Sequence, residues 1–576
     1  MRIKSFAVNN FRGITGGLDK NVINFDDSNT IFVFGQNNVG KSSILKAYEA
    51  FYEDEVTDKD FNNANGADIE IEVEFVIEET TDKPIIDAAS NNKFDNLKNT
   101  YLDSNNILKL KKTFKSSDKG KKPDNQTYKP SGLGYETKGY GGVGLHAPFK
   151  TMMLQPLYIK AMPSEADVET IVTEVLKEVA TSRLKDTERA ELKAAEEIIK
   201  KLQAEIYKAS DIDIYKREVN EKFSHLFNGF EIDIDEGSSK AKFTHDKIGK
   251  DFKVRFKTKD ETPIFNDYDQ MGHGSVRIAI FLLMLMRDKL HGESETKKNF
   301  LVLFEEPELF LHPVLTKELR SLIYEVSDRE TPFQVLCASH SPQMIDISKD
   351  HSSLARMVKE DDGTEIFQVQ QEDLKTDDED TKEKVKQKLH EILRFDPYVC
   401  ESFYACEVLL VEGDTEAIIA RGFQQVFNES RKVYVLNCHS VSNIPFYQKF
   451  FSKFKIPYSV ICDTDSTKEP LPKGWNNDNE NPIFTGGIQK SIYDQFAIDK
   501  VTGVSRNFFV FDNTFETPHK ALDDPFKYSF PASGGKPFNA NAYWKQLISA
   551  KTDDNETDFN AVPIVKYLRK IMLKGE

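Results

Sequence analysis

The stretch FVFGQNNVGKSSILKAY, residues 32–48, decides the fold of the N-terminal part of this chain. It combines an apolar strand, a glycine loop and the start of a helix, and it fits the pattern G-x-x-x-x-G-K-[ST]. In such a loop the backbone N–H groups surround phosphates, the lysine reaches the β- and γ-phosphates, and the serine holds Mg²⁺. The sequence therefore predicts an ATP site. Its loop residues are Gly35, Asn38, Gly40, Lys41, Ser42 and Ser43.

Two further strands supply polar groups that suit this site. KNFLVLFEEPELFLHP, residues 298–313, is apolar up to Glu305 and Glu306. We expect Glu305 to contact Mg²⁺, directly or through water, and Glu306 to polarise the attacking water. FQVLCASHSPQMID, residues 333–346, ends its apolar run before His340, which can hydrogen-bond the γ-phosphate. Taken alone, a histidine in this position is more often structural.

A glycine-containing segment opens a long apolar helix in DYDQMGHGSVRIAIFLLMLM, residues 267–286. A helix N-terminus preceded by glycines can bind an anion, although an ordinary helix start is the better explanation of this segment when it is taken by itself. The candidate ATP-binding residues here are Gly272, Gly274 and Ser275.

Length and composition restrict the class of protein. With 576 residues we expect two to four domains. A net charge of −17 argues against a surface that is a nucleic-acid footprint throughout, but not against a local basic groove or a site built on metal ions. Five cysteines without a CxxC pair favour a reducing compartment over a disulfide framework or a zinc cluster. No apolar run is long enough to span a membrane, so we expect a soluble, cytoplasmic protein.

A second set of acids follows a charge-rich linker at residues 370–387. EVLLVEGDTEAII, residues 407–419, is a buried strand that ends in Glu412 and continues to Glu416. YSVICDTDS, residues 458–466, is another apolar strand, ending in two aspartates. Carboxylates crowded at strand ends repel one another unless a hard cation such as Mg²⁺ lies between them. The predicted metal ligands from these two motifs are Glu412, Glu416, Asp463 and Asp465.

The order of the first four motifs resembles the ATP-binding cassette superfamily, in its RecF- and SMC-like branch. The resemblance implies that the Gly-Ser helix start completes the ATP site of a partner subunit, and that residues 164–225 form a helical insertion used in dimerisation. The family's glutamine loop is not securely placed, and Gln155 is a weak candidate. E-G-D-T-E followed by D-T-D resembles the Toprim domain of topoisomerases, primases and some nucleases.

An ABC-type ATPase joined to a Toprim domain resembles the OLD (overcoming lysogenisation defect) nucleases, which include the Gabija and retron-associated antiphage nucleases. Two late segments carry the resemblance further: DNTFETPH implies a metal ligand at Glu516, and SGGKPFNANAYWKQL implies a catalytic lysine at Lys536. Asp414 then has a supporting role. NCHSVSNIPFY lacks the glycines common in the family, which leaves open whether Ser440 or Ser442 supplies its small polar group.

The expected fold class is therefore α/β, with an ABC/RecF-like ATPase domain, its helical dimerisation insertion and a C-terminal Toprim domain. The expected boundaries are 1–163 and 226–395 for the ATPase, 164–225 for the insertion and 396–576 for Toprim. Lys109–Lys129 looks like a strand running into a surface loop; it could contact phosphates, although a solvated loop explains it equally well.

The expected function is an ATP-regulated DNA endonuclease with Mg²⁺ or Mn²⁺, catalytic Glu306, His340, Glu412 and Lys536, and a role in phage defence. One alternative is an SMC/RecF-like repair ATPase whose Toprim domain binds DNA without cleaving it. Another is a nucleotide sensor that assembles a partner. The expected partners are DNA, further copies in a homodimer or tetramer, and a helicase subunit or a retron reverse transcriptase with its cDNA, with no membrane.

Overall fold

The computed structural model forms two compact units, Met1–Asp346 with Ser352–Gln368 and Ile347–His351 with Val369–Glu576. It describes residues 1–25, 28–62, 66–89, 93–118, 122–136, 146–164, 167–173, 210–226, 230–236, 252–258, 265–266, 271–286, 299–326, 333–346, 353–361, 363–369, 397–427, 432–465 and 487–573. The predicted linker 370–387 and the predicted boundary at 395 and 396 lie outside these residues. Within them, no helix has the length and apolar character that crossing a membrane requires.

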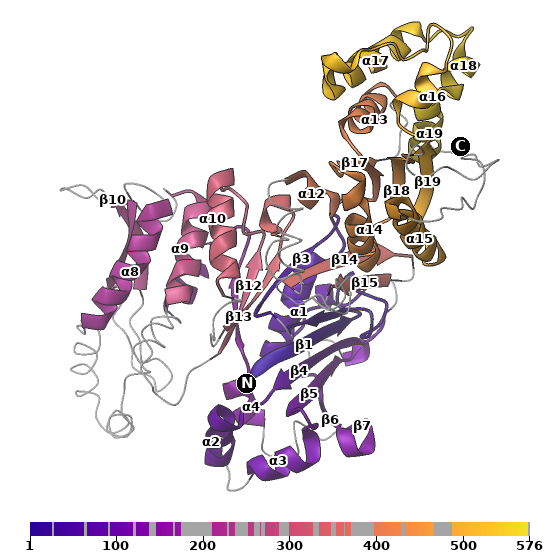
Figure 1. Cartoon of the computed structure of the whole chain (residues 1–576). Helices are drawn as coiled ribbons and strands as arrows, with labels where there is room; N and C mark the ends of the chain where they lie inside the picture. The colour runs from indigo at the N-terminus through magenta and orange to yellow at the C-terminus, as the bar shows by residue number, and fades with distance from the viewer. Residues whose placement is uncertain are drawn as a thin grey trace. The chain divides into compact units, whose positions relative to one another are not determined.

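A six-stranded sheet with the order β15-β14-β3-β13-β12-β8 forms the centre of the first unit (Figure 1). Its strands run parallel except β15, which is antiparallel to β14. β3 is buried along its whole length, and β12 is buried up to its last residue, as a sheet covered on both faces requires. The strands are β3 (Thr30–Phe34), β8 (Gln155–Ile159), β12 (Phe300–Glu305), β13 (Phe333–Ala338), β14 (Leu354–Glu360) and β15 (Gly363–Gln368).

Helix α1 (Lys41–Glu53) starts at the glycine loop after β3 and packs against both this sheet and a second one. The second sheet is antiparallel, with the order β2-β1-β4-β5-β6-β7. Buried and half-buried residues alternate in β4, which confirms the period of two read from its sequence. Its strands are β1 (Arg2–Asn9), β2 (Val22–Asn24), β4 (Ile69–Val76), β5 (Ile107–Phe114), β6 (Asp124–Lys129) and β7 (Gly134–Glu136).

The stretch Lys109–Lys129 was expected to be a strand that runs into a surface loop. Strand β5 confirms the first part, but the loop is wrong for residues 124–129, which form β6. Five described lysines of this stretch are ion-paired with acids of the same unit, mostly across strands, which favours sheet structure. The pairs are Lys109–Glu72, Lys111–Glu70, Lys112–Asp54, Lys115–Asp124 and Lys129–Glu136. Charge that is already neutralised in this way gives little support for phosphate contacts.

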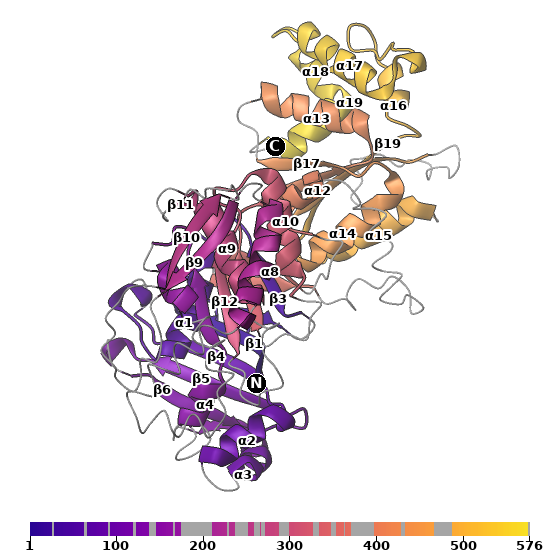
Figure 2. The same ribbon diagram turned by 90° about the vertical axis from the view of Figure 1, so that its left-hand side faces the viewer.

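The helices of the first unit lie beside these sheets. α2, α3 and α4 pack together at the antiparallel sheet, and α8 packs on α9 and on a small sheet of the order β11-β10-β9 (Figure 2). Most of the predicted insertion 164–225 lies outside the described residues, which include only its two ends. These elements are α2 (Glu79–Ala89), α3 (Lys93–Tyr101), α4 (His146–Met152), α8 (Ser210–Leu226), β9 (Phe230–Glu236), β10 (Phe252–Thr258), β11 (Phe265–Asn266), α9 (His273–Met286) and α10 (Pro313–Tyr324).

The second unit is built on a four-stranded parallel sheet with the order β17-β16-β18-β19. One face packs against α13, α17 and α19, and the other against α14 and α15. The elements are α12 (Pro397–Ser402), β16 (Glu407–Val411), α13 (Asp414–Val426), β17 (Val433–Asn437), α14 (Ile444–Lys453), β18 (Tyr458–Asp463), α15 (Gly487–Val501), β19 (Ser505–Phe511), α16 (Glu516–Lys520), α17 (Lys536–Ala550), α18 (Glu556–Ala561) and α19 (Pro563–Met572).

Candidate functional sites

The loop between β3 and α1 has positive φ angles at three of its predicted residues. The φ angles are 145° at Gly35, 64° at Asn38 and 108° at Gly40. A Cβ atom at Gly35 would lie 2.2 Å from the carbonyl oxygen of Met357 on β14. Only glycine therefore lets the loop approach the neighbouring strand this closely. The chain makes the tight turn that a phosphate-binding loop requires.

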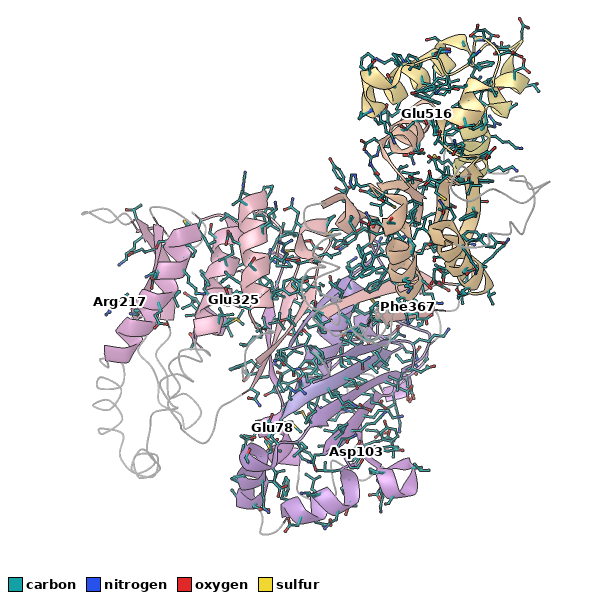
Figure 3. All side chains as sticks on the ribbon, viewed as in Figure 1. Glu78, Asp103, Arg217, Glu325, Phe367 and Glu516 are labelled. Carbon is teal, nitrogen blue, oxygen red and sulfur yellow. The ribbon has the colours of Figure 1, made fainter. Side chains whose placement is uncertain are left out.

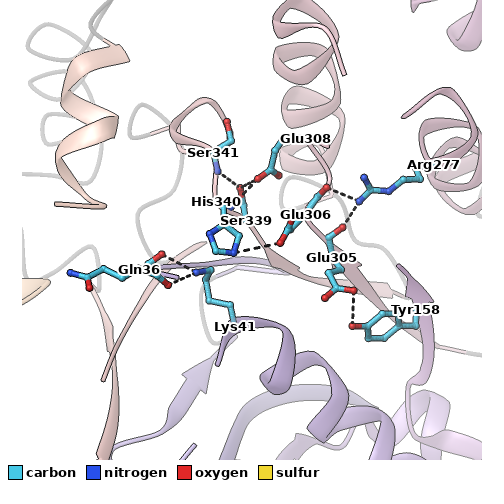
Figure 4. Close-up of polar contacts among 11 residues, drawn as sticks. Gln36, Lys41, Tyr158, Arg277, Glu305, Glu306, Glu308, Ser339, His340 and Ser341 are labelled. Carbon is cyan, nitrogen blue, oxygen red and sulfur yellow. Dashed lines mark hydrogen bonds and ion pairs between the residues drawn. The ribbon is translucent and has the colours of Figure 1, made fainter. Parts of the chain in front are cut away.

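Lys41 opens α1 and is 3% exposed. Its ammonium group donates to the carbonyl oxygens of Gly35 at 2.9 Å and Gln36 at 2.6 Å (Figure 4). Burial lowers the pKa of Lys41 to about 8, and the carboxylates of Glu306 and Glu308 act in the opposite direction. The loop, its lysine and the double-acid segment therefore form one electrostatic group.

The two acids after β12 point to different partners (Figure 4). Glu305 accepts a hydrogen bond at Oε2 from the hydroxyl group of Tyr158, at 3.2 Å. Glu306 has a φ of 43°, and its Oε1 lies 3.5 Å from Nε2 of His340. Burial and the nearby Lys41 lower the pKa of His340. The divergence of the two carboxylates fits the separate roles expected for a metal ligand and a water-polarising group.

Glu308 is a site residue that the motifs did not reveal. Its Oε1 accepts hydrogen bonds from the Ser339 hydroxyl at 3.0 Å and from the His340 backbone N–H at 2.8 Å. Burial raises the pKa of Glu308. This carboxyl group fixes the turn that carries His340. The sequence signal was its place as the third acid in EEPE.

The helix start at residues 272–275 contacts the acids through Arg277, another residue the motifs did not reveal. The Arg277 guanidinium is fully buried and donates to the backbone carbonyls of Glu305 and Glu306, the latter at 2.7 Å (Figure 4). A Cβ at Gly274 would meet Leu311 Cδ2 at 2.5 Å, so glycine permits close packing of α9. The predicted contact of Gly272, Gly274 and Ser275 with ATP on a partner subunit remains a prediction.

Gln155 lies away from these acids. β8 and β12 are parallel, and Gln155 pairs with Phe300 at the opposite end of β12 from Glu305. Glu305 lies five positions further along the strand than Phe300, which corresponds to a rise of roughly 16 Å. The structure therefore does not support Gln155 as the residue of the glutamine loop. The β8 residue that contacts Glu305 is Tyr158.

In the second unit, the carboxyl ends of adjacent parallel strands bring the two acid motifs together. Glu412 follows β16 and Asp463 ends β18, and Glu412 Oε2 accepts a hydrogen bond from the Asp463 backbone N–H at 3.1 Å. Glu416 lies in the first turn of α13 and is 5% exposed. These three acids come from separate motifs and share one end of the sheet.

Burial and mutual repulsion raise the pKa values in this group. The pKa of Asp463 is raised to about 9 by burial, then by the charges of Glu416 and Glu412. The pKa of Glu416 is raised to about 7 by burial and by Glu412, and the charge of Lys536 acts in the opposite direction. Glu516, labelled in Figure 3, adds to the repulsion at Asp463. Four predicted residues thus act on the charge of Glu416 or Asp463: Glu412 acts on both, Lys536 on Glu416 and Glu516 on Asp463, and Glu416 itself acts on Asp463.

A backbone hydrogen bond fixes the position of Asp465. It has a φ of 49°, and its N–H donates to the carbonyl oxygen of Asn513 at 2.9 Å. This contact ties the end of β18 to the loop that leads to Glu516. The Asp414 carboxylate accepts from Asn437 Nδ2 at 2.7 Å, which fits its expected supporting role. Ser440 accepts from the backbone N–H of Ser442, so the choice between them stays open.

The acids of the second unit fit a divalent ion by their chemistry. Within the described ranges, no three His, Cys, Asp or Glu side chains are close enough together to hold a metal ion. However, Asp463 Oδ1 is buried without a hydrogen-bond partner. The candidate donors are all carboxylate oxygens, the type that Mg²⁺ and Mn²⁺ prefer, and their repulsion requires a positive charge.

Two protein-family models match the chain. A model of the AAA ATPase domain matches residues 1–136 and 150–345, more than half of the chain. A model of the TOPRIM domain of overcoming lysogenization defect-like proteins matches residues 403–465, which include the first acid motif and both aspartates of the second. The chain belongs to the family of the AAA ATPase domain, and its C-terminal part matches a TOPRIM domain of the OLD-like type. The resemblance and the fold class inferred from the motifs are confirmed, and the two units are the ATPase unit and the Toprim unit.

Two curated relatives match this chain over part of its length. The Old nuclease of Escherichia phage P2 is 27% identical over 215 residues, 36% of this chain and 34% of that protein. The OLD nuclease of Thermus scotoductus is 24% identical over 258 residues, 42% of this chain and 46% of that protein. The matches therefore span less than half of each relative. A solved Smc head domain with an extended coiled coil, bound to the C-terminal domain of ScpA and derived from Pyrococcus furiosus, covers 68% of this chain and 100% of that chain at 12% identity and a TM-score of 0.42.

Proposed function

We propose that this chain is a DNA endonuclease that depends on a divalent metal, is regulated by ATP and acts in phage defence. The observation that carries the nuclease is the buried acid group around Asp463, whose Oδ1 has no hydrogen-bond partner and whose pKa is raised to about 9. Buried carboxylates that repel one another need a cation, and a nuclease site needs one at a phosphodiester. The family supports the same conclusion.

In the Toprim unit, the roles follow from position. The predicted ligands are Glu412, Glu416, Asp463, Asp465 and Glu516. A divalent ion held there would supply the positive charge that activates water and neutralises the phosphate. Lys536, whose charge already acts on Glu416, is at the N-terminus of α17 and stabilises charge that develops on the phosphate oxygens.

In the ATPase unit, Lys41 and the loop N–H groups bind the phosphates, and Ser42 and Glu305 hold Mg²⁺. Glu306 orients the attacking water, and His340, 3.5 Å from Glu306, contacts the γ-phosphate. ATP binding or hydrolysis then controls cleavage. Self-association as a dimer or tetramer, a helicase or reverse transcriptase partner, and the defence role are carried by the family resemblance.

A plasmid nicking assay tests this proposal. The wild-type chain is compared with Glu412→Ala and Lys41→Ala, with Mg²⁺ or Mn²⁺ and with or without ATP. We expect nicking that requires metal and Glu412, and that responds to ATP only when Lys41 is present. Glu401→Ala serves as a matched control, because Glu401 lies in the same unit and its carboxylate bonds only to Tyr434 among the described contacts.

The repair-ATPase alternative has one observation in its favour. No three acids of the described part of the Toprim unit converge to ligand distance. Two results would make the nuclease proposal fail while ATP hydrolysis stays intact: nicking that needs metal but not Glu412, or no nicking at all. The alternative, a Toprim unit that binds DNA or a partner, would then take its place.

A further inference from the structure

Tyr158 contacts the first acid of the ATP site from a neighbouring strand. In the parallel pair β8 and β12, Tyr158 is opposite Leu303, and Glu305 is two residues further along on the same face. A long side chain reaches such a diagonal neighbour. The Tyr158 hydroxyl donates to Glu305 Oε2 at 3.2 Å (Figure 4). Among the described residues, it is the only hydrogen-bond donor to this carboxylate.

The surroundings of Tyr158 keep its ring in place. It is 9% exposed, and Lys46 Nζ lies 3.9 Å from its ring centroid. Lys46 belongs to α1, the helix that starts at the phosphate-binding loop, and it also pairs with Glu49 at 2.7 Å. Burial raises the pKa of Tyr158, followed by the effect of the Glu305 charge. The hydroxyl therefore stays protonated and acts as a donor across the range in which proteins work.

We infer that Tyr158 is a positioning residue for Glu305, which it orients for metal-dependent nucleotide binding. The inference rests on the proposed function, because it assigns Glu305 to the metal of the ATP site. A carboxylate with one fixed oxygen has fewer orientations to lose when it becomes a ligand. Partners that orient ligands in this way typically change metal affinity by about 10- to 100-fold when they are removed.

The test measures binding of a fluorescent, slowly hydrolysed ATP analogue to the full chain, in excess Mg²⁺ and in EDTA. Tyr158→Phe keeps the ring and removes only the hydroxyl. We expect its Kd in EDTA to match the wild type within about two-fold and the gain from Mg²⁺ to fall by about 10-fold or more. Tyr158→Gln, whose amide can donate to a carboxylate, should recover part of that gain.

Tyr101→Phe is the matched control. The Tyr101 hydroxyl donates to Glu136 at 2.7 Å, so this variant breaks the same kind of bond away from the ATP site. It should leave both Kd values unchanged. Equal losses in Mg²⁺ and in EDTA for Tyr158→Phe, or no loss, would overturn the inference while the wild type still shows the Mg²⁺ gain. A wild type without any Mg²⁺ gain would instead overturn the proposed ATP site.

Discussion

The ATP site and the Toprim site both place carboxylates at the carboxyl ends of parallel strands, but they balance the negative charge differently. In the ATP site each acid has at least one side-chain partner from the chain itself, although Glu308 Oε2 is buried without a hydrogen-bond partner. Tyr158 donates to Glu305, His340 lies 3.5 Å from Glu306, and Ser339 donates to Glu308. Such a site is organised before any ligand arrives.

In the Toprim site the acids act on one another more strongly. Burial and the Glu412 charge raise the pKa of Glu416, and burial with the charges of Glu416 and Glu412 raises the pKa of Asp463, whose Oδ1 is buried without a hydrogen-bond partner. Lys536 is the cation among the described residues whose charge lowers the pKa of Glu416. Under the proposed function, the groups of the ATP site are in place before an anionic ligand binds, whereas the Toprim acids would need a proton or a cation to neutralise them.

Replacing Asp463 breaks this comparison most strongly. Asp463→Asn removes a carboxylate that would ligate the metal, so we expect nicking to fall by about 100- to 1000-fold. The melting temperature without metal should stay equal or rise near neutral pH, because folding raises the pKa of Asp463 to about 9 and therefore requires it to take up a proton, which Asn does not need. Nicking and thermal unfolding, measured on the same preparation, check both parts.

Asp494→Asn is the control for that prediction. Asp494 is exposed on α15 in the same unit and forms an ion pair with Lys490, so its loss should leave nicking unchanged. If the Asp463→Asn variant nicks at the wild-type rate, this group of acids is not part of the catalytic site.

The corresponding substitution of an acid in the ATP site, Glu306→Gln, should not raise the melting temperature. Glu306→Gln keeps the size of the side chain but removes the charge that polarises water, so ATP hydrolysis should fall by about 100-fold or more. ATP binding should persist, since Lys41 and the loop are intact. Glu325→Gln is the control, because Glu325 pairs with Lys222 on the same unit's surface. Loss of binding together with hydrolysis would argue for a structural role of Glu306.

The sequence was sufficient for features that depend on local pattern. The alternation in β4, the glycine loop and the acids after β12, β16 and β18 follow from residue type and spacing alone. Parallel strands then bring the acids of separate motifs to one edge, so Glu412 and Asp463 could be paired without a structure.

Strand register was the information that the sequence lacked. Tyr158 reaches Glu305 only because β8 and β12 pair with Leu303 opposite Tyr158. Arg277 likewise contacts backbone carbonyls, which leave no trace in residue type. The residues of β6 were read as a surface loop, because the register that pairs β6 with β5 is not evident from residue type. The proximity of Lys536 to Glu416 came from family resemblance and not from spacing.

The pH dependence of stability sharpens the contrast between the two sites. The folded-state pKa values of Asp463, about 9, and Glu416, about 7, exceed their ordinary values of 3.8 and 4.5. The folded Toprim unit thus binds more protons than the unfolded chain, and its stability falls as pH rises from about 4 to about 9. Mg²⁺ or Mn²⁺ replaces those protons, so metal should stabilise the chain more at about pH 8 than at about pH 6.

Thermal unfolding with metal and with EDTA measures this effect across that pH range. In Asp463→Asn the slope should be shallower, because one of the two groups no longer titrates. A metal-free melting temperature that increases steadily from about pH 6 to about pH 8 would contradict the raised pKa values of Asp463 and Glu416.

The smallest expected effect on stability and nicking concerns the packing of the helix that carries Lys536. Its helix α17 packs on α13, where a Cβ at Gly422 would lie 2.5 Å from Trp544 Nε1. Alanine would favour the helix by about 1 kcal/mol, but overpacking costs about 1–3 kcal/mol, so Gly422→Ala should be mildly destabilising. A shift of α17 would also move Lys536 and reduce nicking several-fold, while ATP hydrolysis stays unchanged.

Urea unfolding and both activity assays test the packing at Gly422. Gln425→Ala, on the exposed side of the same helix, should change stability by less than about 0.5 kcal/mol. Adding Trp544→Phe to Gly422→Ala should relieve the clash, so the two changes together should cost less than their sum. A Gly422→Ala variant that is more stable and nicks normally would show that α13 and α17 can separate without moving Lys536. In that case the contrast with the ATP site would rest on the acids alone.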